Sequence, residues 1–463
     1  MKPNDVISPL TQIVGHENLL TSIEDCATYG TDWTRYPGKA MAVVLPKSTT
    51  EVVQILKTCH SANIAVVPSG GRTGLAGGAS VQSNQIALSL RRMNGISTVQ
   101  LAPRTVSVQA GAITQSVHEH CEPHGLIWPI DLAAKGSSTI GGNLSTNAGG
   151  VRVVRYGMTR KWVSAIQAVM MDGTLLELNH GLEKNNTGYD LMQLLIGSEG
   201  TLAVITEATL KLARVPKHVF VCLLGIPNLK AALSLFELAR DQPFEILACE
   251  FFSDQCQQAV QKHLKRHNRL AQEAPFYLLI EVDSGDGTDT LTAWLAKQLD
   301  TGLVIDGALG VSSVERKNLW ALREGITESI ALTGPVKKYD VAVPVIDIVK
   351  FLEEAQNLFN QMKLPIDLYL FGHLGDGSPH LNLVKQPQAT QKDFEAAAER
   401  FEKELYPLTK SYRGSLSAEH GVGVLKKSWV LYSRTPAELE IYRSIKRSFD
   451  PKGLLNPGKI IDL

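Results

Sequence analysis

The chain has 463 residues, which is long enough for two or three domains and a large buried core. Its 46 basic and 46 acidic residues balance, and it carries no basic block, so binding of nucleic acid through net charge is excluded. No apolar run approaches the roughly 20 residues that a membrane-spanning helix needs, and the N-terminus lacks the apolar region of a signal peptide.

The first half of the chain shows a helix, several short strands and glycine-rich loops. Residues 48–51 (Ser-Thr-Thr-Glu) have the spacing of a capping box and predict the start of a helix. Its apolar face is predicted to contain Val52, Ile55, Leu56 and Cys59. A buried strand is predicted at residues 64–67, and short strands are predicted at 85–90, 105–110 and 165–170. A β-rich run at residues 200–206 then leads into 208–212.

The pattern changes near residue 215. Strands such as 219–224 and 276–282 then alternate with amphipathic helices such as 229–240 and 288–299, and residues 283–288 predict a turn. This alternation favours an α+β domain built on an antiparallel sheet. We expect domains at residues 1–215 and 216–415, and a C-terminal segment at 416–463 that packs back on the first domain.

Three loops in the N-terminal half are rich in Gly, Ser, Thr and Asn, at residues 68–78, 129–150 and 197–206. Glycine allows the backbone to approach a ligand closely, and the short polar side chains can bind phosphate and ribose. None of the loops contains the GxGxxG of a Rossmann site. A lone Gly-Gly pair is usually a turn, but three such loops together favour a dinucleotide pocket of another type.

Two motifs near the C-terminus predict metal chemistry. His373 and His380 frame a glycine-rich segment, and Glu419 lies in a second motif, residues 417–423. Two imidazoles and a carboxylate suit a divalent metal such as zinc and leave one coordination position open for a substrate. His420 is adjacent to a predicted ligand and is a candidate general base.

A structural role is the common alternative for any single histidine. We assign that role to His118, His120 and His124, which lie around a probable helix without the glycine-rich and carboxylate context of the C-terminal motifs.

The chain resembles the D-lactate and D-2-hydroxyglutarate dehydrogenase branch of the vanillyl-alcohol oxidase and p-cresol methylhydroxylase flavoproteins. The resemblance runs from about residue 36 to 459 and rests on Lys-Gly-Ser at 135–137, Ile-Gly-Gly-Asn at 140–143, Thr-Asn-Ala-Gly-Gly at 146–150, Arg-Tyr-Gly at 155–157 and Asn-Thr-Gly-Tyr-Asp at 186–190. It implies an FAD-binding domain of the p-cresol methylhydroxylase type, an α+β cap domain with an antiparallel sheet that binds the substrate, and a C-terminal segment that returns to the flavin.

The resemblance also implies which residues contact FAD. Some relatives attach FAD through a histidine in the first loop, whereas this chain has Arg72 there, so non-covalent binding is expected. The implied contacts are Pro68, Ser69, Gly70, Gly71, Arg72, Thr73, Gly74, Gly77, Gly78, Pro129, Asp131, Gly136, Ser137, Thr139, Gly141, Gly142, Asn143, Ser145, Asn147, Gly149, Glu199, Gly200, Val204, Ile205 and Asn456.

For the reaction, the resemblance implies FAD-dependent oxidation of a D-2-hydroxy acid, with D-2-hydroxyglutarate the leading substrate. Arg323 and Thr327, on a helix predicted at 319–327, would hold a substrate carboxylate together with Lys338, and Asn382 would add a contact. The adjacent Lys337 is the alternative to Lys338, and lone charges of this kind are usually solvated. In the family, the segment at 373–380 resembles His-Leu-Gly-Asp-Gly-Asn-Leu-His. This chain departs from that motif at residues 378–379, Ser-Pro, but keeps both histidines. Reduced flavin would pass its electrons to an electron-transfer flavoprotein or a quinone.

Three alternatives stay open at this point. The first is a D-lactate or D-malate dehydrogenase with the same chemistry. The second is a non-redox flavoprotein like the alkyl-dihydroxyacetone-phosphate synthases, and the third is a flavin-binding protein without catalysis. The sequence leaves open the metal's identity and the oligomeric state, for which a homodimer is one candidate.

The six cysteines are scattered, without a CxxC pair, and predict free thiols in a reducing compartment. We therefore expect a cytoplasmic protein. The sequence leaves peripheral contact with a membrane open.

Overall fold

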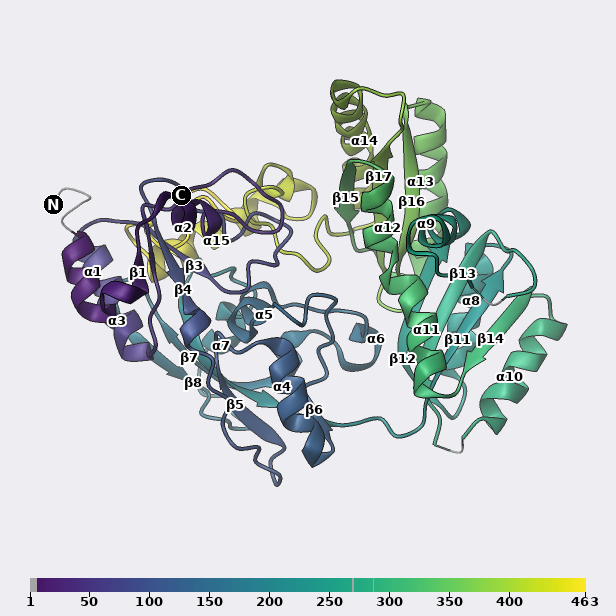
Figure 1. Ribbon diagram of the computed structural model, residues 1–463, viewed down its shortest axis with the longest axis horizontal. Coiled ribbons are helices and arrows are strands. Elements are labelled where there is room, and N and C mark those ends of the chain that lie inside the picture. Colours follow the sequence, from purple (N-terminus) through teal and green to yellow (C-terminus); the bar gives the residue numbers. More distant parts are fainter. Residues whose placement is uncertain (1–5, 269, 286) are drawn as a thin grey trace. The chain divides into compact units, whose positions relative to one another are not determined.

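The computed structural model describes residues 6–268, 270–285 and 287–463, and it divides into two compact units (Figure 1). Unit 1 combines the chain up to Gly150 with Met158–Val215 and Glu419–Leu463, and unit 2 combines Val151–Gly157 with Pro216–Ala418. Both mix helices with sheets, so the predicted α+β class is confirmed. Within the described ranges, none of the helices has the length and apolar character needed to cross a bilayer.

One sheet of unit 1 is mostly parallel and has the strand order β1-β2-β4-β3. Its strands are β1 (Leu19–Leu20), β2 (Ala42–Val44), β4 (Ile86–Ser89) and β3 (Val66–Ser69), and helices α1 (Ile7–Val14), α2 (Ile23–Thr28) and α3 (Thr49–Ser61) lie nearby. At the start of α3, Ser48 Oγ accepts the Glu51 N–H at 3.2 Å, as the motif predicts. Glu51 Oε2 instead accepts the Lys47 N–H at 2.8 Å, so only one half of the capping box forms. The predicted apolar face of the helix is buried.

The second sheet of unit 1 is antiparallel, with the order β5-β9-β7-β8. Its strands are β5 (Thr105–Gln109), β9 (Val204–Lys211), β7 (Val163–Val169) and β8 (Leu175–Leu178). A small ribbon pairs β6 (Leu126–Ile127) with β10 (Ala213–Arg214). The β-rich run predicted at 200–206 becomes a strand only at Val204, because Gly200 has a positive φ of 67° and residues 200–203 form a loop.

Four helices complete unit 1: α4 (Thr114–Cys121), α5 (Ile140–Thr146), α7 (Leu191–Leu195) and α15 (Pro436–Phe449). The shorter 3-10 turns of this unit are η2 (His16–Asn18), η3 (Leu90–Arg92), η4 (Glu122–His124), η5 (Thr159–Trp162) and η7 (Lys427–Tyr432). Trp128 is fully buried at the centre of the core that packs on the antiparallel sheet.

Unit 2 is built on one antiparallel sheet with the order β14-β11-β13-β12-β16-β17-β15. Its strands are β14 (Asp306–Gly310), β11 (Val219–Ile226), β13 (Phe276–Asp283), β12 (Glu245–Ser253), β16 (Ile366–His373), β17 (Ser378–Lys385) and β15 (Val336–Asp340). The expected antiparallel sheet is therefore present. Asp286, in the predicted turn at 283–288, lies outside the described residues.

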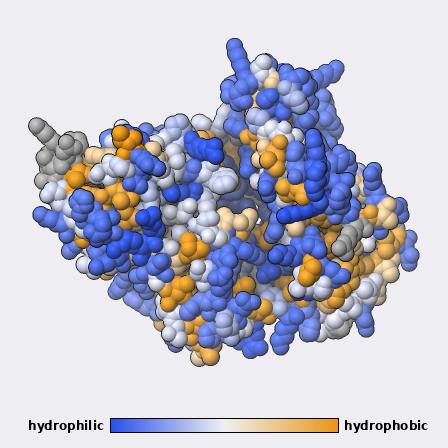
Figure 2. Space-filling model, in the orientation of Figure 1, coloured by the Kyte–Doolittle hydropathy of each residue, from blue (hydrophilic) through white to orange (hydrophobic). Residues whose placement is uncertain are grey.

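The helices of unit 2 cover its sheet on both faces (Figure 1). They are α6 (Val153–Tyr156), α8 (Leu229–Arg240), α9 (Asp254–Leu264), α10 (Asp289–Asp300), α11 (Ser313–Glu324), α12 (Ile326–Thr333), α13 (Ile348–Met362) and α14 (Gln391–Ser411), with the 3-10 turn η6 (Val345–Asp347). Apolar residues of α9, α11 and α12 share one core with Phe252, Tyr277 and Phe371 of the sheet. The end of unit 2 that carries α14 is hydrophilic in Figure 2, consistent with burial of that helix's apolar side chains on its inner face.

The helix predicted at 319–327 is wrong as a single element. α11 ends at Glu324, and α12 begins at Ile326, with Gly325 between them. A side chain at Gly325 would meet Leu264 of α9 at 2.8 Å, which explains why glycine is needed at the break.

The short segment Val151–Gly157 belongs to unit 2, although it lies inside the predicted FAD-binding domain. Arg152 forms an ion pair with Glu281 at 2.9 Å, and α6 packs against β12. Arg155 also pairs with Glu245 at 2.6 Å. These partners are far apart in sequence, so the local pattern could not reveal them.

The C-terminal boundary also lies three residues beyond the predicted one. Ala342 and Ser415 exchange two backbone hydrogen bonds, at 2.9 and 2.8 Å. The Ala418 N–H then donates to the Asp340 carbonyl at 3.3 Å. These bonds attach residues 416–418 to β15.

Candidate active site

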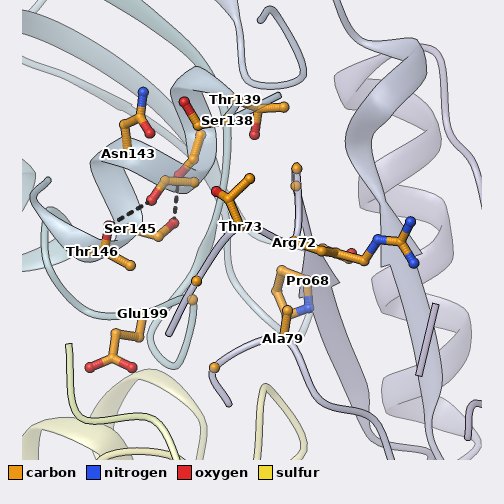
Figure 3. Close-up of a pocket in the computed structure, with 18 of the residues that line it drawn as sticks. Pro68, Arg72, Thr73, Ala79, Ser138, Thr139, Asn143, Ser145, Thr146 and Glu199 are labelled. Carbon is orange, nitrogen blue, oxygen red and sulfur yellow. Dashed lines mark hydrogen bonds between the residues drawn. The ribbon is translucent and has the colours of Figure 1, made fainter. Parts of the chain in front are cut away.

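Unit 1 contains a cavity where the three glycine-rich loops meet. Figure 3 shows Pro68 and Thr73 of the first loop facing Ser145 of the second, with Glu199 of the third loop at the edge. His420, from the C-terminal segment, also lines this cavity.

Many of the residues predicted to contact a cofactor line the cavity. They are Pro68, Ser69, Gly70, Gly71, Arg72, Thr73, Gly74, Gly78, Thr139, Gly141, Gly142, Asn143, Ser145, Glu199, Gly200, Val204 and Ile205. The predicted residues outside its lining are Gly77, Pro129, Asp131, Gly136, Ser137, Asn147, Gly149 and Asn456. The sequence reasoning missed Asp32, Ala76, Ala79, Leu90, Ala110, Ser138, Thr146 and Ala203. Ser138 and Thr146 adjoin predicted positions, so extending the motifs would have found them.

The first two loops approach each other too closely for side chains. A Cβ on Gly71 would lie 2.0 Å from the Ser137 carbonyl oxygen, and one on Gly70 would lie 2.4 Å from Thr139 Oγ1. Close backbone packing of this kind explains why glycine is needed at both positions.

Buried polar atoms in the cavity lining fit a nucleotide ligand. Among the described residues, Ser69 Oγ, Thr139 Oγ1 and Asp32 Oδ2 are buried and have no hydrogen-bond partner in the protein. Such atoms ordinarily bind something, and ribose hydroxyls and phosphates supply matching donors and acceptors. The donor set and the glycine-lined walls therefore fit FAD.

Arg72 contributes to the cavity wall through its backbone more than through its side chain. The guanidinium lies 4.3 Å from the centre of the Tyr29 ring and donates a hydrogen bond to the Thr28 carbonyl. Figure 3 shows this side chain extending away from Ser145 and Thr146. Its φ of 56° shapes the loop, a conformation that few non-glycine residues adopt.

Glu199 anchors the loop that carries His420. Its carboxylate accepts the N–H groups of Val422 at 2.6 Å and Gly423 at 2.8 Å. Burial raises the pKa of Glu199, and the two backbone donors oppose that shift. A Cβ on Gly421 would lie 2.7 Å from the same carboxylate. Glu199 thus has a structural role that the motif did not predict.

Asn456, predicted to lie by the flavin, ties two of the loops together. Its Nδ2 donates to the Gly78 carbonyl at 3.2 Å and to the Glu199 carbonyl at 2.7 Å. The C-terminal segment therefore packs within unit 1, against the loops that line the cavity.

In unit 2, the β16–β17 hairpin brings His373 and His380 together. Register pairs Phe371 with His380 and His373 with Ser378, which places both histidines on one face of the sheet. Their ring centres are 5.1 Å apart and the rings are nearly perpendicular, at 83°. Two imidazoles at this separation can share one metal ion.

Each histidine has a buried carboxylate beside its Nδ1 atom. Glu250 Oε1 lies 2.6 Å from His373 Nδ1, and Asp340 Oδ1 lies 3.8 Å from His380 Nδ1. Burial would raise the pKa of Glu250, but the adjacent His373 and Arg323 lower it overall. These carboxylates were not predicted, because they are on strands remote in sequence from the histidines.

Glu419 is the first residue of the last segment of unit 1. Its Oε1 accepts the Gly150 N–H at 3.2 Å, and its Oε2 lies 4.0 Å from His420 Nε2. Ala418, the preceding residue, is hydrogen-bonded to Asp340, which pairs with His380 in the sheet.

The predicted substrate residues separate into two groups. Lys338 pairs with Asn382 in the sheet, on the same face as His380. Lys337 faces the other way and forms an ion pair with Glu402 at 2.9 Å. Of the two lysines, Lys338 is therefore the one on the sheet face that carries the histidines.

Arg323 and Thr327 differ in their surroundings. The Arg323 guanidinium is buried, lies over the Phe371 ring at 4.8 Å and pairs with Glu250 at 2.8 Å. Thr327 lies beyond the helix break and is exposed. The prediction that one continuous helix carries both residues is wrong.

Comparison with known proteins decides the family. Residues 40–179 match the model of an FAD binding domain, and residues 215–460 match the C-terminal domain of FAD linked oxidases. A D-2-hydroxyglutarate dehydrogenase of Xanthomonas citri pv. viticola is 41% identical over 98% of this chain and 97% of its own length. The chain belongs to this family of FAD-linked oxidoreductases. The mitochondrial D-2-hydroxyglutarate dehydrogenase of Bos taurus is 40% identical over 96% of this chain and 81% of its own length.

Solved structures agree on the fold of this family member. An alkyldihydroxyacetonephosphate synthase matches with a TM-score of 0.74 at 20% identity, over 98% of this chain and 85% of the synthase. A substrate-bound p-cresol methylhydroxylase matches with a TM-score of 0.73 at 14% identity, over 99% of this chain and 97% of the hydroxylase. The fold predicted from the family resemblance is confirmed.

Proposed function

We propose that this oxidoreductase oxidises D-2-hydroxyglutarate to 2-oxoglutarate, with FAD bound non-covalently in the cavity of unit 1. The observation that carries the proposal is the sheet face of unit 2, where His373, His380, Lys338 and Asn382 are neighbours. Relatives named D-2-hydroxyglutarate dehydrogenase, about 40% identical over nearly the whole chain, support the substrate.

The cations of unit 2 suit a dicarboxylate. Lys338 offers a point charge on the sheet face, and Arg323 offers a guanidinium fork next to the same strands. Of the candidate acids, 2-hydroxyglutarate and malate carry two carboxylates, whereas lactate carries one. A dicarboxylate would use both cations, with the Arg323 guanidinium also paired with Glu250.

A divalent metal, with zinc as our candidate, would be held by His373, His380 and Glu419. The two imidazoles fit this role, because each has a carboxylate next to Nδ1 that can orient the ring. A metal bound there supplies Lewis acidity, which lowers the pKa of the substrate's 2-hydroxyl group.

His420 would take the proton from the 2-hydroxyl group as general base. Its place in the lining of the unit 1 cavity, on a loop that Glu199 anchors, supports this role. The bound flavin supplies a hydride acceptor, so the substrate loses the Cα hydrogen with its electron pair and the hydroxyl proton, and a C=O bond forms.

We further propose an electron-transfer flavoprotein or a quinone as the acceptor that reoxidises the flavin, and a homodimer as the assembly. We also place the enzyme in the cytoplasm. The cysteines of the described chain, all free and buried, support a reducing compartment.

The test is anaerobic mixing of the flavin-loaded, metal-replete enzyme with D-2-hydroxyglutarate while flavin absorbance is followed. We expect rapid bleaching with the D-enantiomer and none with the L-enantiomer. His420→Ala should slow bleaching by about 10²–10⁴-fold, the usual contribution of a general base.

D-lactate and D-malate serve as competitors in the same assay. Faster reduction by either would replace the proposed substrate while keeping the chemistry. A His420→Ala enzyme that is reduced as fast as the wild type would remove the proposed base.

A further inference from the structure

We infer that Glu250 is a positioning residue that serves both the metal site and the substrate's carboxylate anchor. The inference rests on the proposed function, because it assigns a partner to the proposed metal ligand His373. Glu250 is not itself a proposed ligand, and it lies more than a hundred residues from either motif that predicted the site.

The sheet brings Glu250 to His373. Antiparallel pairing of β12 with β16 sets the two residues directly opposite each other. Glu250 is 1% exposed, and its Oε1 lies 2.6 Å from His373 Nδ1. A short contact between an imidazole and a buried carboxylate is a charge-assisted hydrogen bond.

This hydrogen bond determines which ring nitrogen can bind a metal. An ionised carboxylate only accepts, so Nδ1 of His373 must carry the proton and donate it to Glu250. The Nε2 atom then carries the lone pair that a metal ion needs. At His380 the corresponding distance, from Nδ1 to Asp340 Oδ1, is 3.8 Å. The contact between Glu250 and His373 is therefore the shorter of the two carboxylate–imidazole contacts.

The other oxygen of the Glu250 carboxylate forms an ion pair with Arg323. Glu250 Oε2 lies 2.8 Å from Arg323 Nη2, and the Arg323 guanidinium stacks over Phe371. Arg323 is on α11, whereas His373 is on β16, so one buried carboxylate connects a proposed ligand with the proposed anchor. Loss of its charge would release both groups.

Glu281 provides a matched control. It lies on the neighbouring strand β13, is 4% exposed, pairs with Arg152 at 2.9 Å and accepts from Trp320 Nε1 of α11 at 2.7 Å. Like Glu250, it is buried and contacts one arginine and α11, but its contacts among the described residues include no histidine. Glu281→Gln reports the cost of removing a buried charge without touching the metal site.

The experiment measures the zinc affinity of the full-length, flavin-loaded protein by competition with a chromophoric chelator. Glu250→Gln should weaken zinc binding by about 10–100-fold, as outer-shell partners typically do. Glu281→Gln should stay within about twofold of the wild type. Glu250→Gln should also raise KM for the hydroxy acid, because Arg323 loses the carboxylate that positions it.

A measurement on the wild type keeps the inference testable if Glu250→Gln does not fold. In zinc-loaded protein with ¹⁵N-labelled histidine, the His373 signal, assigned with His373→Gln, should show a protonated Nδ1 and a zinc-bound Nε2. Zinc bound through Nδ1 would overturn the inference.

The remaining outcomes separate this inference from the proposed function. Tight zinc binding by the wild type with equal affinity in Glu250→Gln would overturn the role of Glu250 alone. Wild-type protein that binds zinc no better than His373→Ala would overturn the metal site and, with it, this inference.

Discussion

Replacing Gly71 by alanine should disrupt the loops around the flavin cavity and lower the free energy of unfolding. The new Cβ would lie 2.0 Å from the Ser137 carbonyl oxygen and 3.1 Å from Ser138 Cα. The clash is with backbone, so a rotamer change cannot relieve it, and the second loop would have to move by more than about 1 Å to reach an ordinary C···O separation. Overpacking of this kind costs about 1–3 kcal/mol, and a backbone clash belongs at the upper end.

The assay is thermal unfolding of the flavin-free protein followed by circular dichroism. A loss of about 3 kcal/mol should lower the Tm of the transition of unit 1 by roughly 6–12 °C, on the scale for domains of about 150–250 residues. FAD affinity should fall in parallel, because Gly71 lines the cavity.

Gly74→Ala is the control from the same loop. Its Cβ would have Asp32 Oδ2, at 4.0 Å, as its nearest neighbour, which is ordinary contact, so the flavin-free variant should melt close to the wild type. If Gly71→Ala also melts within about 2 °C of the wild type, the close loop packing does not exist in solution.

The remaining predictions concern a buried lysine, a buried thiol and the proposed base. Burial lowers the pKa of Lys459 to about 8, so the folded state binds its proton less tightly than the unfolded state does, and the stability contributed by this group should rise as pH increases from about 8 to 10.5. Lys459→Gln should flatten that part of the curve of unfolding free energy against pH, and an unchanged slope would contradict the assignment. Burial raises the pKa of Cys59 to about 12, so this thiol should resist alkylation in the native protein and react after denaturation, as mass spectrometry of the labelled peptide can show. The loss of flavin reduction in His420→Ala, measured by stopped flow, should exceed any change in FAD affinity.

Local pattern was enough to place most of the regular elements. Helix α8 spans the predicted residues, 229–240, because its apolar residues repeat at helical spacing and face one core. Strand ends were less certain: the strand predicted at 64–67 begins at Val66, because the Ile64 N–H is used by the Cys59 carbonyl at the end of α3. A hydrogen bond to a preceding helix has no signature in the apolar pattern.

The candidate site was predicted from motifs whose members are close in sequence. The glycine-rich loops and the spacing of His373 and His380 are local features, and the structure places those loops around one cavity and those histidines on one sheet face. The continuous helix predicted at 319–327 was wrong, because a break at Gly325 separates Arg323 on α11 from Thr327 on α12.

Hydrophobic period and residue type encode the class of fold, the glycine-rich loops and the histidine pair locally, so the chain alone predicts them. Which carboxylate lies beside which histidine, and which glycines contact distant backbone, depends on tertiary packing. Glu250 meets His373, and Gly71 meets Ser137, through strand pairing and loop packing between segments far apart in the chain. Contacts of that kind depend on how whole elements pack together, and no local period or spacing records that arrangement.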